Sequence, residues 1–204
     1  MTIFIKKTMK ILFLDFDGVI CLSSEWGSRY NKKGHHSNHE NVHMRFDNFN
    51  KKGLVVLNSI IDETDCEIVV SSDWKNWADI HDFGQLFDYW GIKKKPIGVT
   101  ESYNSDMDTF DVTKIDPNDI LEYERCCEIK HWLRQHPLVS HWVAVDDLDL
   151  GVTRKWFEEG YENEWGLTNF VHTPKENEGL KQCGVKTKIV NILNRPLPRF
   201  TTID

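Results

Sequence analysis

Short, unbroken runs of apolar residues alternate along the chain with longer segments in which apolar positions recur every three or four residues. The short runs are typical of strands buried on both faces of a parallel sheet, and the longer segments are typical of helices that bury one face. The strand-like runs are residues 11–14, 67–70, 142–145 and 169–172. The helix-like segments are residues 54–61, 120–135 and 185–193. This alternation predicts an α/β fold with a doubly wound, mostly parallel sheet and right-handed crossovers.

Two polar segments interrupt the alternation and predict small cap or lid insertions. Residues 23–50 have few periodic apolar positions, and residues 98–118 are acidic and rich in serine, threonine and aspartate. Long segments without regular structure inside a compact domain are usually functional or disordered. A chain of 204 residues is long enough for one domain with a full core, so we expect a single domain over residues 1–204.

The first strand-like run ends in two aspartates, Asp15 and Asp17, which are followed at once by Gly18. Ligands of open α/β sheets bind beyond the carboxyl ends of the strands, so both carboxylates are expected at a ligand site. Glycine allows the backbone to turn sharply there. Two carboxylates so close together repel each other unless a cation or a shared proton stabilises them. Mg²⁺ is the expected cation because it prefers oxygen ligands.

Two further strand-like runs end in polar side chains. One run is followed by the hydroxyls of Ser71 and Ser72, and another by the carboxylates of Asp146 and Asp147. Taken alone, a serine after a strand usually marks a turn or caps a helix. Two aspartates after a strand, taken alone, usually mark no more than an acidic turn. The carboxyl ends of parallel strands share one edge of a sheet, so these side chains are expected near Asp15.

The hexapeptide that begins at Asp15, Asp-Phe-Asp-Gly-Val-Ile, resembles the first motif of the haloacid dehalogenase (HAD) superfamily of phosphohydrolases. The other features follow in the order of that family: a strand ending in a hydroxyl, a basic helix, and a strand with an acidic end. The resemblance extends from Lys10 to about Leu193. It implies a HAD-like Rossmannoid fold in which the two polar insertions form caps over the active site.

Three short sequences narrow the resemblance to one branch of the superfamily, which includes phosphatase domains attached to RNA-repair proteins. They are Ser-Ser-Asp-Trp from Ser71, Trp-Val-Ala-Val-Asp-Asp from Trp142, and Asn-Glu-Gly-Leu from Asn177. Lys75 departs from the branch, which often has arginine after the tryptophan. This difference leaves a role of Lys75 toward the substrate open.

The resemblance implies a Mg²⁺-dependent phosphomonoesterase. Asp15 would attack phosphorus and form an aspartyl-phosphate, Asp17 would serve as general acid and base, and Ser71 would bind a phosphoryl oxygen. A basic residue on the helix-like segment would neutralise the phosphoryl charge. Arg125 is preferred for this role, and Lys130 is the alternative.

The Mg²⁺ ligands implied by the resemblance are Asp15, the backbone carbonyl of Asp17, and either Asp146 or Asp147. Ser72 is a second candidate for substrate binding, although it would also suit the cap of the following helix.

Basic residues in the first insertion are candidates for selecting the substrate. Arg29, Lys32 and Lys33 follow the first motif and would attract a polyanion. The histidines between His35 and His43 have spacing that would suit a transition metal on a helix, but a polar, solvated lid is the favoured interpretation because no cysteine joins them. We therefore expect this insertion to bind substrate and to contribute little to the chemistry.

The net charge of the chain limits the class of substrate. The net charge of −7 argues against a broad grip on nucleic-acid backbone and favours nucleotides or small metabolites, whereas the basic insertion and the branch resemblance favour nucleic-acid ends. A non-catalytic phosphate-binding module is the alternative from another class.

The cysteine pattern and the hydropathy of the chain bear on its compartment. Five cysteines without Cys-x-x-Cys spacing predict a reducing compartment. No apolar run approaches the ~20 residues of a membrane span, and the start is a poor signal peptide, so we expect a cytoplasmic protein without a membrane partner. The oligomeric state is not predicted.

Overall fold

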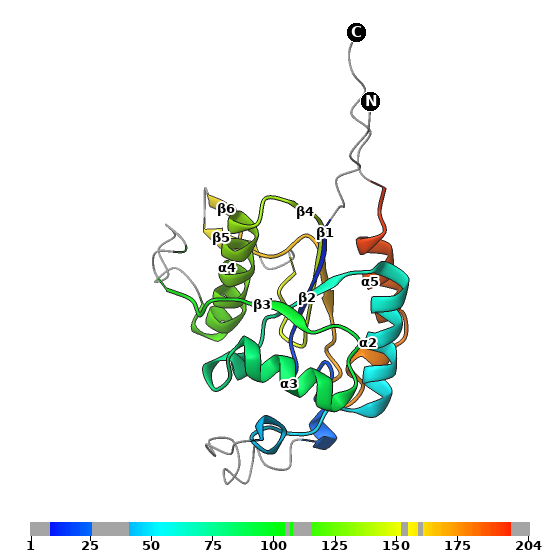
Figure 1. Ribbon diagram of the computed structural model, residues 1–204. Helices are drawn as coiled ribbons and strands as arrows, with labels where there is room; N and C mark the ends of the chain where they lie inside the picture. The colour runs from blue at the N-terminus through cyan, green and yellow to red at the C-terminus, as the bar shows by residue number, and fades with distance from the viewer. Residues whose placement is uncertain are drawn as a thin grey trace.

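The computed structural model of the protein describes residues 9–25, 41–104, 107, 116–151, 155–158 and 161–196. Its centre is a five-stranded, all-parallel sheet with the strand order β3-β2-β1-β4-β7 (Figure 1). These strands are β1 (Met9–Leu14), β2 (Glu67–Val70), β3 (Pro96–Val99), β4 (Val139–Asp146) and β7 (Phe170–His172). A separate antiparallel pair consists of β5 (Lys155–Glu158) and β6 (Tyr161–Glu164). The predicted α/β fold class with a parallel sheet is confirmed.

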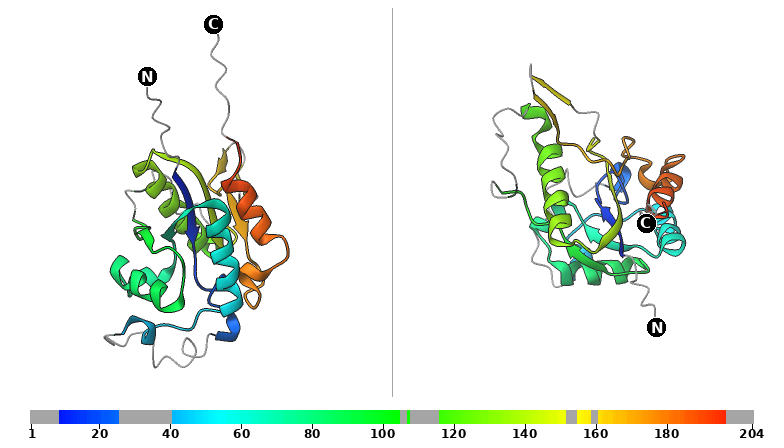
Figure 2. Two further views of the ribbon diagram at one scale, coloured as in Figure 1. Left: turned by 45° about the vertical axis from the view of Figure 1, so that its right-hand side comes forward. Right: turned by 90° about the horizontal axis from the view of Figure 1, so that it is seen from above.

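Helices cover both faces of the sheet (Figures 1 and 2). The helices α2 (Lys51–Thr64), α3 (Ile80–Trp90) and α5 (Val185–Leu193) pack on one face, and α4 (Ile120–Gln135) packs on the other. Side chains of β1 alternate between the two cores: Leu12 and Leu14 face the first, whereas Ile11 and Phe13 face the second. The apolar run in β1 is unbroken because both of its faces are buried. Short 3₁₀ helices are η1 (Ser23–Glu25), η2 (Val42–Met44), η3 (Asp73–Asn76), η5 (Pro117–Asp119) and η6 (Gly179–Lys181).

Capping side chains mark where helices α2 and α3 begin, and a glycine marks where α3 ends. The Asn50 side chain accepts a hydrogen bond from the backbone N–H of Gly53 and caps α2, and Asp79 caps α3 in the same way. Helix α3 ends at Gly91, whose φ of 70° lies in the left-handed region that glycine adopts readily. These caps satisfy backbone groups that a helix end would leave unpaired.

The prediction of a loop insertion over residues 98–118 is wrong at its first residues. Gly98 and Val99 belong to β3, an edge strand that begins at Pro96. Proline is tolerated there because an edge strand need not donate every backbone N–H to a neighbour. Helix α3, which the apolar pattern did not single out, lies just before this strand. The rest of the insertion falls partly outside the described residues.

The first predicted insertion is described only at its two ends. Residues 26–40, which include Arg29, Lys32 and Lys33 and all but the last of the clustered histidines, lie outside the described residues. At the far end, Val42, Phe46 and Phe49 are buried in the core. Within the described part of the chain, no helix has the length and apolar composition needed to cross a membrane.

Candidate active site

A tight turn follows β1 at the edge of the sheet where the strands end. It consists of residues 15–22 and is called here the Asp15 loop. The backbone N–H of Asp15 donates to the carbonyl of Val145, and the carbonyl of Phe16 accepts from the N–H groups of Ile20 and Cys21. Gly18 has a φ of 64°, and a Cβ atom there would lie 2.3 Å from Oδ2 of Asp147. Glycine is therefore needed both for the turn and for the close approach of that carboxylate.

Three carboxylates converge beside this turn. Candidate ligand oxygens of Asp15, Asp146 and Asp147 all lie within 4.8 Å of one another. Asp15 and Asp146 are buried, with exposed fractions of 4% and 2%, and Asp147 is half-buried. The sequence left open which aspartate of the second pair approaches Asp15, and in the structure both do.

Burial makes this cluster a site of perturbed protonation. Loss of solvation raises the pKa of Asp15 well above its ordinary value, and the neighbouring charge of Asp146 adds to the effect. Burial also raises the pKa of Asp146 to about 6, against the opposing influence of Arg125. For Asp147, burial and the charge of Asp146 raise the pKa to about 7. Concentrated negative charge in a buried place calls for a counter-ion.

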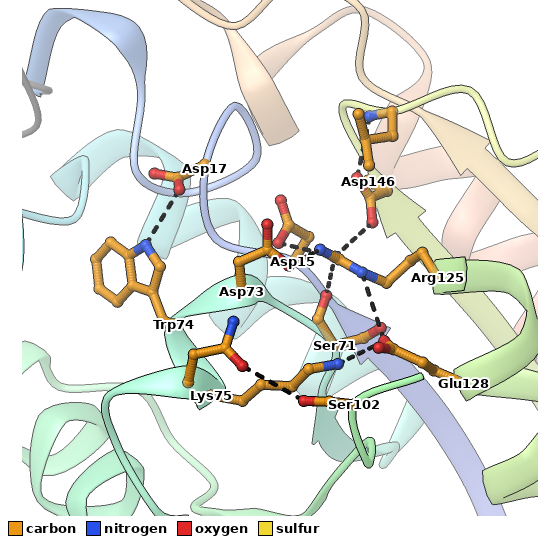
Figure 3. A network of polar contacts seen from close by, with 12 residues as sticks. Asp15, Asp17, Ser71, Asp73, Trp74, Lys75, Ser102, Arg125, Glu128 and Asp146 are labelled. Atoms are coloured by element: carbon orange, nitrogen blue, oxygen red, sulfur yellow. Dashed lines mark hydrogen bonds and ion pairs between the residues drawn. The ribbon is translucent and has the colours of Figure 1, made fainter. Parts of the chain in front are cut away.

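Arg125 supplies positive charge to this cluster from α4 (Figure 3). Its Nη1 atom lies 3.2 Å from Oδ1 of Asp15 and 3.0 Å from Oδ2 of Asp146. The same atom donates to the carbonyl of Ser71 at 2.5 Å, and Nη2 donates to Asp73 at 2.8 Å. Burial lowers the pKa of Arg125, but the charges of Asp146 and Asp15 outweigh it and raise the pKa above its ordinary value.

The structure separates the two basic candidates on α4. Lys130 donates a hydrogen bond from Nζ to the carbonyl of Trp165 at 2.6 Å and is placed away from the contacts of Arg125. Arg125 is therefore the residue of this pair that contacts Asp15.

Ser71 and Ser72 lie where β2 ends, next to Asp15, which directly follows β1. The backbone N–H of Ser71 donates to the carbonyl of Leu14, which fixes this serine beside the start of the Asp15 loop. The hydroxyl oxygens of Ser71 and Ser72 are buried, and neither has a hydrogen-bond partner among the described residues. Buried hydroxyl groups are rarely left unpaired, so these two are suited to bind a ligand atom.

A buried ion pair between Lys75 and Glu128, which the sequence did not predict, lies beside Arg125. Lys75 Nζ lies 2.5 Å from Oε2 of Glu128, and this same oxygen lies 3.7 Å from Nε of Arg125 (Figure 3). The other Glu128 oxygen accepts from the backbone N–H of Tyr103. Burial lowers the pKa of Lys75, and Glu128 opposes this shift. The available signal was the i, i+3 spacing of Arg125 and Glu128, which places both on one face of a helix.

Trp74 is a second contact that the sequence did not predict. Its Nε1 atom donates to Oδ2 of Asp17 at 3.1 Å, and Figure 3 shows the Asp17 side chain turned toward this indole. The indole is 2% exposed and stacks on Phe46 at a centroid distance of 4.5 Å and on Phe49 at 5.6 Å. Packing thus holds the donor in one orientation. The carboxylate of Asp17 is set apart from the cluster of Asp15, so a metal contact through its backbone carbonyl stays a prediction.

The late segment singled out in the sequence packs under the Asp15 loop. Leu180 donates its backbone N–H to the carbonyl of Val19 at 3.0 Å, and Ser23 donates to the carbonyl of Glu176. Gly179 has a φ of 52°, and a Cβ atom there would lie 2.1 Å from the Val19 oxygen. This contact requires glycine, and it braces the turn that carries Asp15.

The donor set of the cluster fits a hard divalent cation. The donor atoms of Asp15, Asp146 and Asp147 are carboxylate oxygens, and burial raises the pKa of each of the three despite the opposing charge of Arg125. Oxygen ligands of this kind suit Mg²⁺ or Ca²⁺ rather than metals that prefer sulfur or nitrogen.

Comparison with known proteins agrees with this geometry. Residues 11–182 match the family model described as the HAD domain in Swiss Army Knife RNA repair proteins. No curated protein and no solved structure matches the chain. The matched range begins in β1 and includes every residue of the cluster described above.

Proposed function

Because the chain belongs to the family of HAD domains found in Swiss Army Knife RNA repair proteins, we propose that it is a Mg²⁺-dependent phosphomonoesterase that acts on nucleic-acid or nucleotide terminal phosphates. The observation that carries the proposal is the contact of Arg125 with both Asp15 and Asp146 at the ends of adjacent strands. A buried guanidinium between two such carboxylates suits an enzyme that must hold an anionic group against an anionic nucleophile.

In the proposed reaction, a carboxylate oxygen of Asp15 attacks phosphorus while the ester oxygen leaves, which gives an aspartyl-phosphate. Arg125 and the hydroxyl of Ser71 bind phosphoryl oxygens and orient the group for in-line attack. When bound by Asp15, Asp146 and Asp147, Mg²⁺ would offset negative charge and polarise the phosphate.

Asp17 has the proposed role of general acid and base. It donates a proton to the leaving oxygen, and the resulting carboxylate then takes a proton from the water that hydrolyses the aspartyl-phosphate. The product is inorganic phosphate, and both Asp15 and Asp17 return to their starting forms. The hydrogen bond from Trp74 to Oδ2 holds the Asp17 carboxyl group in one orientation for this proton transfer.

A substrate panel tests the proposal. Phosphate release should be measured with oligoribonucleotides phosphorylated at the 3′ or the 5′ end, with nucleotides, and with sugar phosphates, each with Mg²⁺ and with chelator. We expect Mg²⁺-dependent turnover that is fastest on nucleotide or oligonucleotide ends. Preference for sugar phosphates would favour the small-metabolite alternative, and phosphate binding without any turnover would favour the non-catalytic alternative.

Magnesium is expected to stabilise the fold more at pH 8 than at pH 5.5. The pKa values of Asp146 and Asp147 are about 6 and about 7, well above those of unfolded carboxyls near ~3.9. At these two groups the metal-free folded chain therefore binds more protons than the unfolded chain, and their contribution to stability falls as pH rises from ~4 to ~7. At pH 8 the cation has no protons to displace. At about ten times its Kd it should raise the unfolding midpoint by roughly 3–6 °C.

Differential scanning calorimetry at both pH values, with NaCl matched for ionic strength, measures this shift. The variant Asp147→Asn should lose most of it, whereas Asp88→Asn, which alters a carboxylate outside the cluster, should retain it. Equal shifts at the two pH values, or a full shift in Asp147→Asn, would contradict the assignment of the metal ligands.

Replacing Trp74 with phenylalanine is expected to slow the reaction selectively for poor leaving groups. The phenyl ring keeps the stack but removes the N–H that orients Asp17. Alkyl phosphates need protonation of the leaving oxygen, whereas p-nitrophenyl phosphate barely does. We expect kcat to fall about tenfold for an alkyl phosphate and less than about threefold for p-nitrophenyl phosphate.

The matched control is Trp77→Phe, at a nearby tryptophan that is 44% exposed. It should leave both rates unchanged. Equal losses on both substrates in Trp74→Phe would mean that Trp74 only supports the local fold.

A further inference from the structure

A shallow groove lined by lysines lies between the start of α2 and the end of α3. Its first hollow has a volume of about 500 Å³ and is lined in part by Lys51, Lys52 and Lys181. Phe49 also lines this hollow but is only 2% exposed, so the half-buried Trp90 supplies its aromatic surface. Three positive charges and one accessible aromatic ring therefore meet at one place on a chain whose net charge is −7.

The groove continues into a second hollow of about 490 Å³. The two hollows share Lys51 and Trp90, so they adjoin. The second adds Tyr89, which is 57% exposed and stacks against His43 on one side. The groove thus offers two neighbouring aromatic side chains, Tyr89 and Trp90, beside Lys51.

The three lysines differ from their neighbours in having no acidic partner among the residues that the structure describes. Lys93, Lys95 and Lys186, which belong to nearby elements, each form an ion pair with an aspartate or a glutamate. No described residue forms an ion pair with Lys51, Lys52 or Lys181, and no acidic residue lines either hollow in the described part of the chain. This positive charge is free to meet an anion from outside the molecule.

The groove adjoins the Asp15 loop. Asn50, which lines it, donates its backbone N–H to the carbonyl of Ile20 at 2.7 Å. Lys181 follows Leu180, which donates to Val19 in the same loop. Ile20 is only three residues from Asp17, a span of at most ~11 Å. Helix α2 also begins at the edge of the sheet where the strands end (Figure 1). The groove therefore lies next to the loop that carries Asp15 and Asp17.

We propose that this groove binds the single-stranded nucleic-acid segment next to the terminal phosphate. Lys51, Lys52 and Lys181 contact phosphodiester groups, and Trp90 with Tyr89 offers surface for base stacking. A positive groove combined with exposed aromatic rings is how proteins bind single strands without reading their sequence. The inference rests on the proposed function, because it names the part of the substrate that the phosphatase site does not hold.

Binding of an unphosphorylated ten-nucleotide RNA, followed by fluorescence anisotropy across a salt series, tests the charge contribution. The triple variant Lys51→Gln, Lys52→Gln, Lys181→Gln should bind at least about tenfold more weakly at low salt. Each lost phosphate contact removes ~0.7 from the slope of log K against log salt for single strands, so the slope should fall by about two.

The matched control removes the same net charge elsewhere, with Lys93→Gln, Lys95→Gln and Lys188→Gln, none of which lines the groove. It should retain nearly all of the affinity and the salt slope. Equal losses in the two triple variants would mean that net charge alone draws the RNA, and this result would overturn the proposal, as would failure of the unaltered protein to bind RNA.

A second variant tests stacking separately from charge. Trp90→Leu should weaken RNA binding about tenfold while leaving the salt slope unchanged. Inorganic polyphosphate of equal charge should bind more weakly than the RNA and should not distinguish Trp90→Leu from the unaltered protein. Polyphosphate that binds as tightly as RNA would contradict a nucleic-acid groove.

This binding assay is independent of turnover. If the protein binds RNA through the groove but releases no phosphate from any substrate, the proposed function fails and the groove assignment stands. If it hydrolyses phosphomonoesters and does not bind RNA, the groove assignment fails and the phosphatase stands.

Discussion

Asp15→Asn is expected to reduce phosphate release by at least ~10⁴-fold, because the amide keeps the shape of the side chain but cannot act as an anionic nucleophile. Asp15 is the only carboxylate that contacts Arg125 from the end of β1 among the described residues, so no neighbour takes its place in line with the bound phosphate. Single-turnover assays with a radiolabelled phosphomonoester should also show no labelled protein, since the aspartyl-phosphate cannot form.

The same variant should fold at least as well as the unaltered protein in chelator. Burial and the charge of Asp146 raise the pKa of Asp15, so its ionised form opposes folding at neutral pH when no metal is bound. An uncharged amide removes that cost, although it also weakens the contact with Arg125. Thermal unfolding followed by circular dichroism measures the outcome. A large loss of stability would mean that Asp15 acts as a structural ion-pair partner, and substantial remaining turnover would exclude it as nucleophile.

The sheet, and the gathering of polar residues at the ends of its strands, could be predicted from the sequence because one rule governs both. Buried parallel strands appear as unbroken apolar runs, and the polar residues directly after them share one edge of the sheet. That rule placed Asp15, Ser71 and Asp146 together although they are far apart along the chain. Their catalytic and metal-binding roles, like those of Arg29, Lys32 and Lys33, stay predictions.

The contacts around these residues could not be predicted because they depend on side chains from other elements. Nothing in the sequence near Trp74 indicates its hydrogen bond to Asp17. The rings of Phe16, Phe46 and Phe49, which come from distant parts of the chain, fix its orientation. In the sequence, Lys75 stands out only as a departure from the branch pattern, which often has arginine at this position. Its partner Glu128 lies on α4, 53 residues later along the chain, and no periodicity in the sequence joins them.

Helix α4 illustrates the limit of periodicity. Its buried side includes Arg125 and Glu128 among Tyr123, Cys126 and Ile129, so polar and apolar residues share the face that packs on the sheet. A helix whose inner face carries charge has a weaker apolar stripe than an ordinary one. The apolar periodicity of a helix is therefore weakest where its buried face carries the charged residues of a functional site.

Arg125→Gln is expected to destabilise the metal-free protein by about 3 kcal/mol at pH 7.5, because it leaves buried carboxylates without their counter-ion. Arg125 contacts Asp15, Asp146 and Asp73 and lies beside Glu128. Its stabilising effect is present where these carboxylates are ionised and is lost as pH falls and they take up protons. Since burial raises the pKa of Asp146 to about 6 even beside Arg125, the loss should be smaller at pH 5.5.

Urea unfolding at both pH values, in chelator and with Mg²⁺, measures this dependence. Mg²⁺ should restore part of the stability of Arg125→Gln, because a cation bound by Asp15 and Asp146 replaces some of the lost positive charge. The control Arg45→Gln breaks the more accessible ion pair with Asp82 and should cost less than ~1 kcal/mol, with little dependence on metal. If both arginine variants lose the same stability at every pH, the guanidinium of Arg125 is no more than an ordinary ion-pair partner, and the site needs another group to balance the charge of the phosphate.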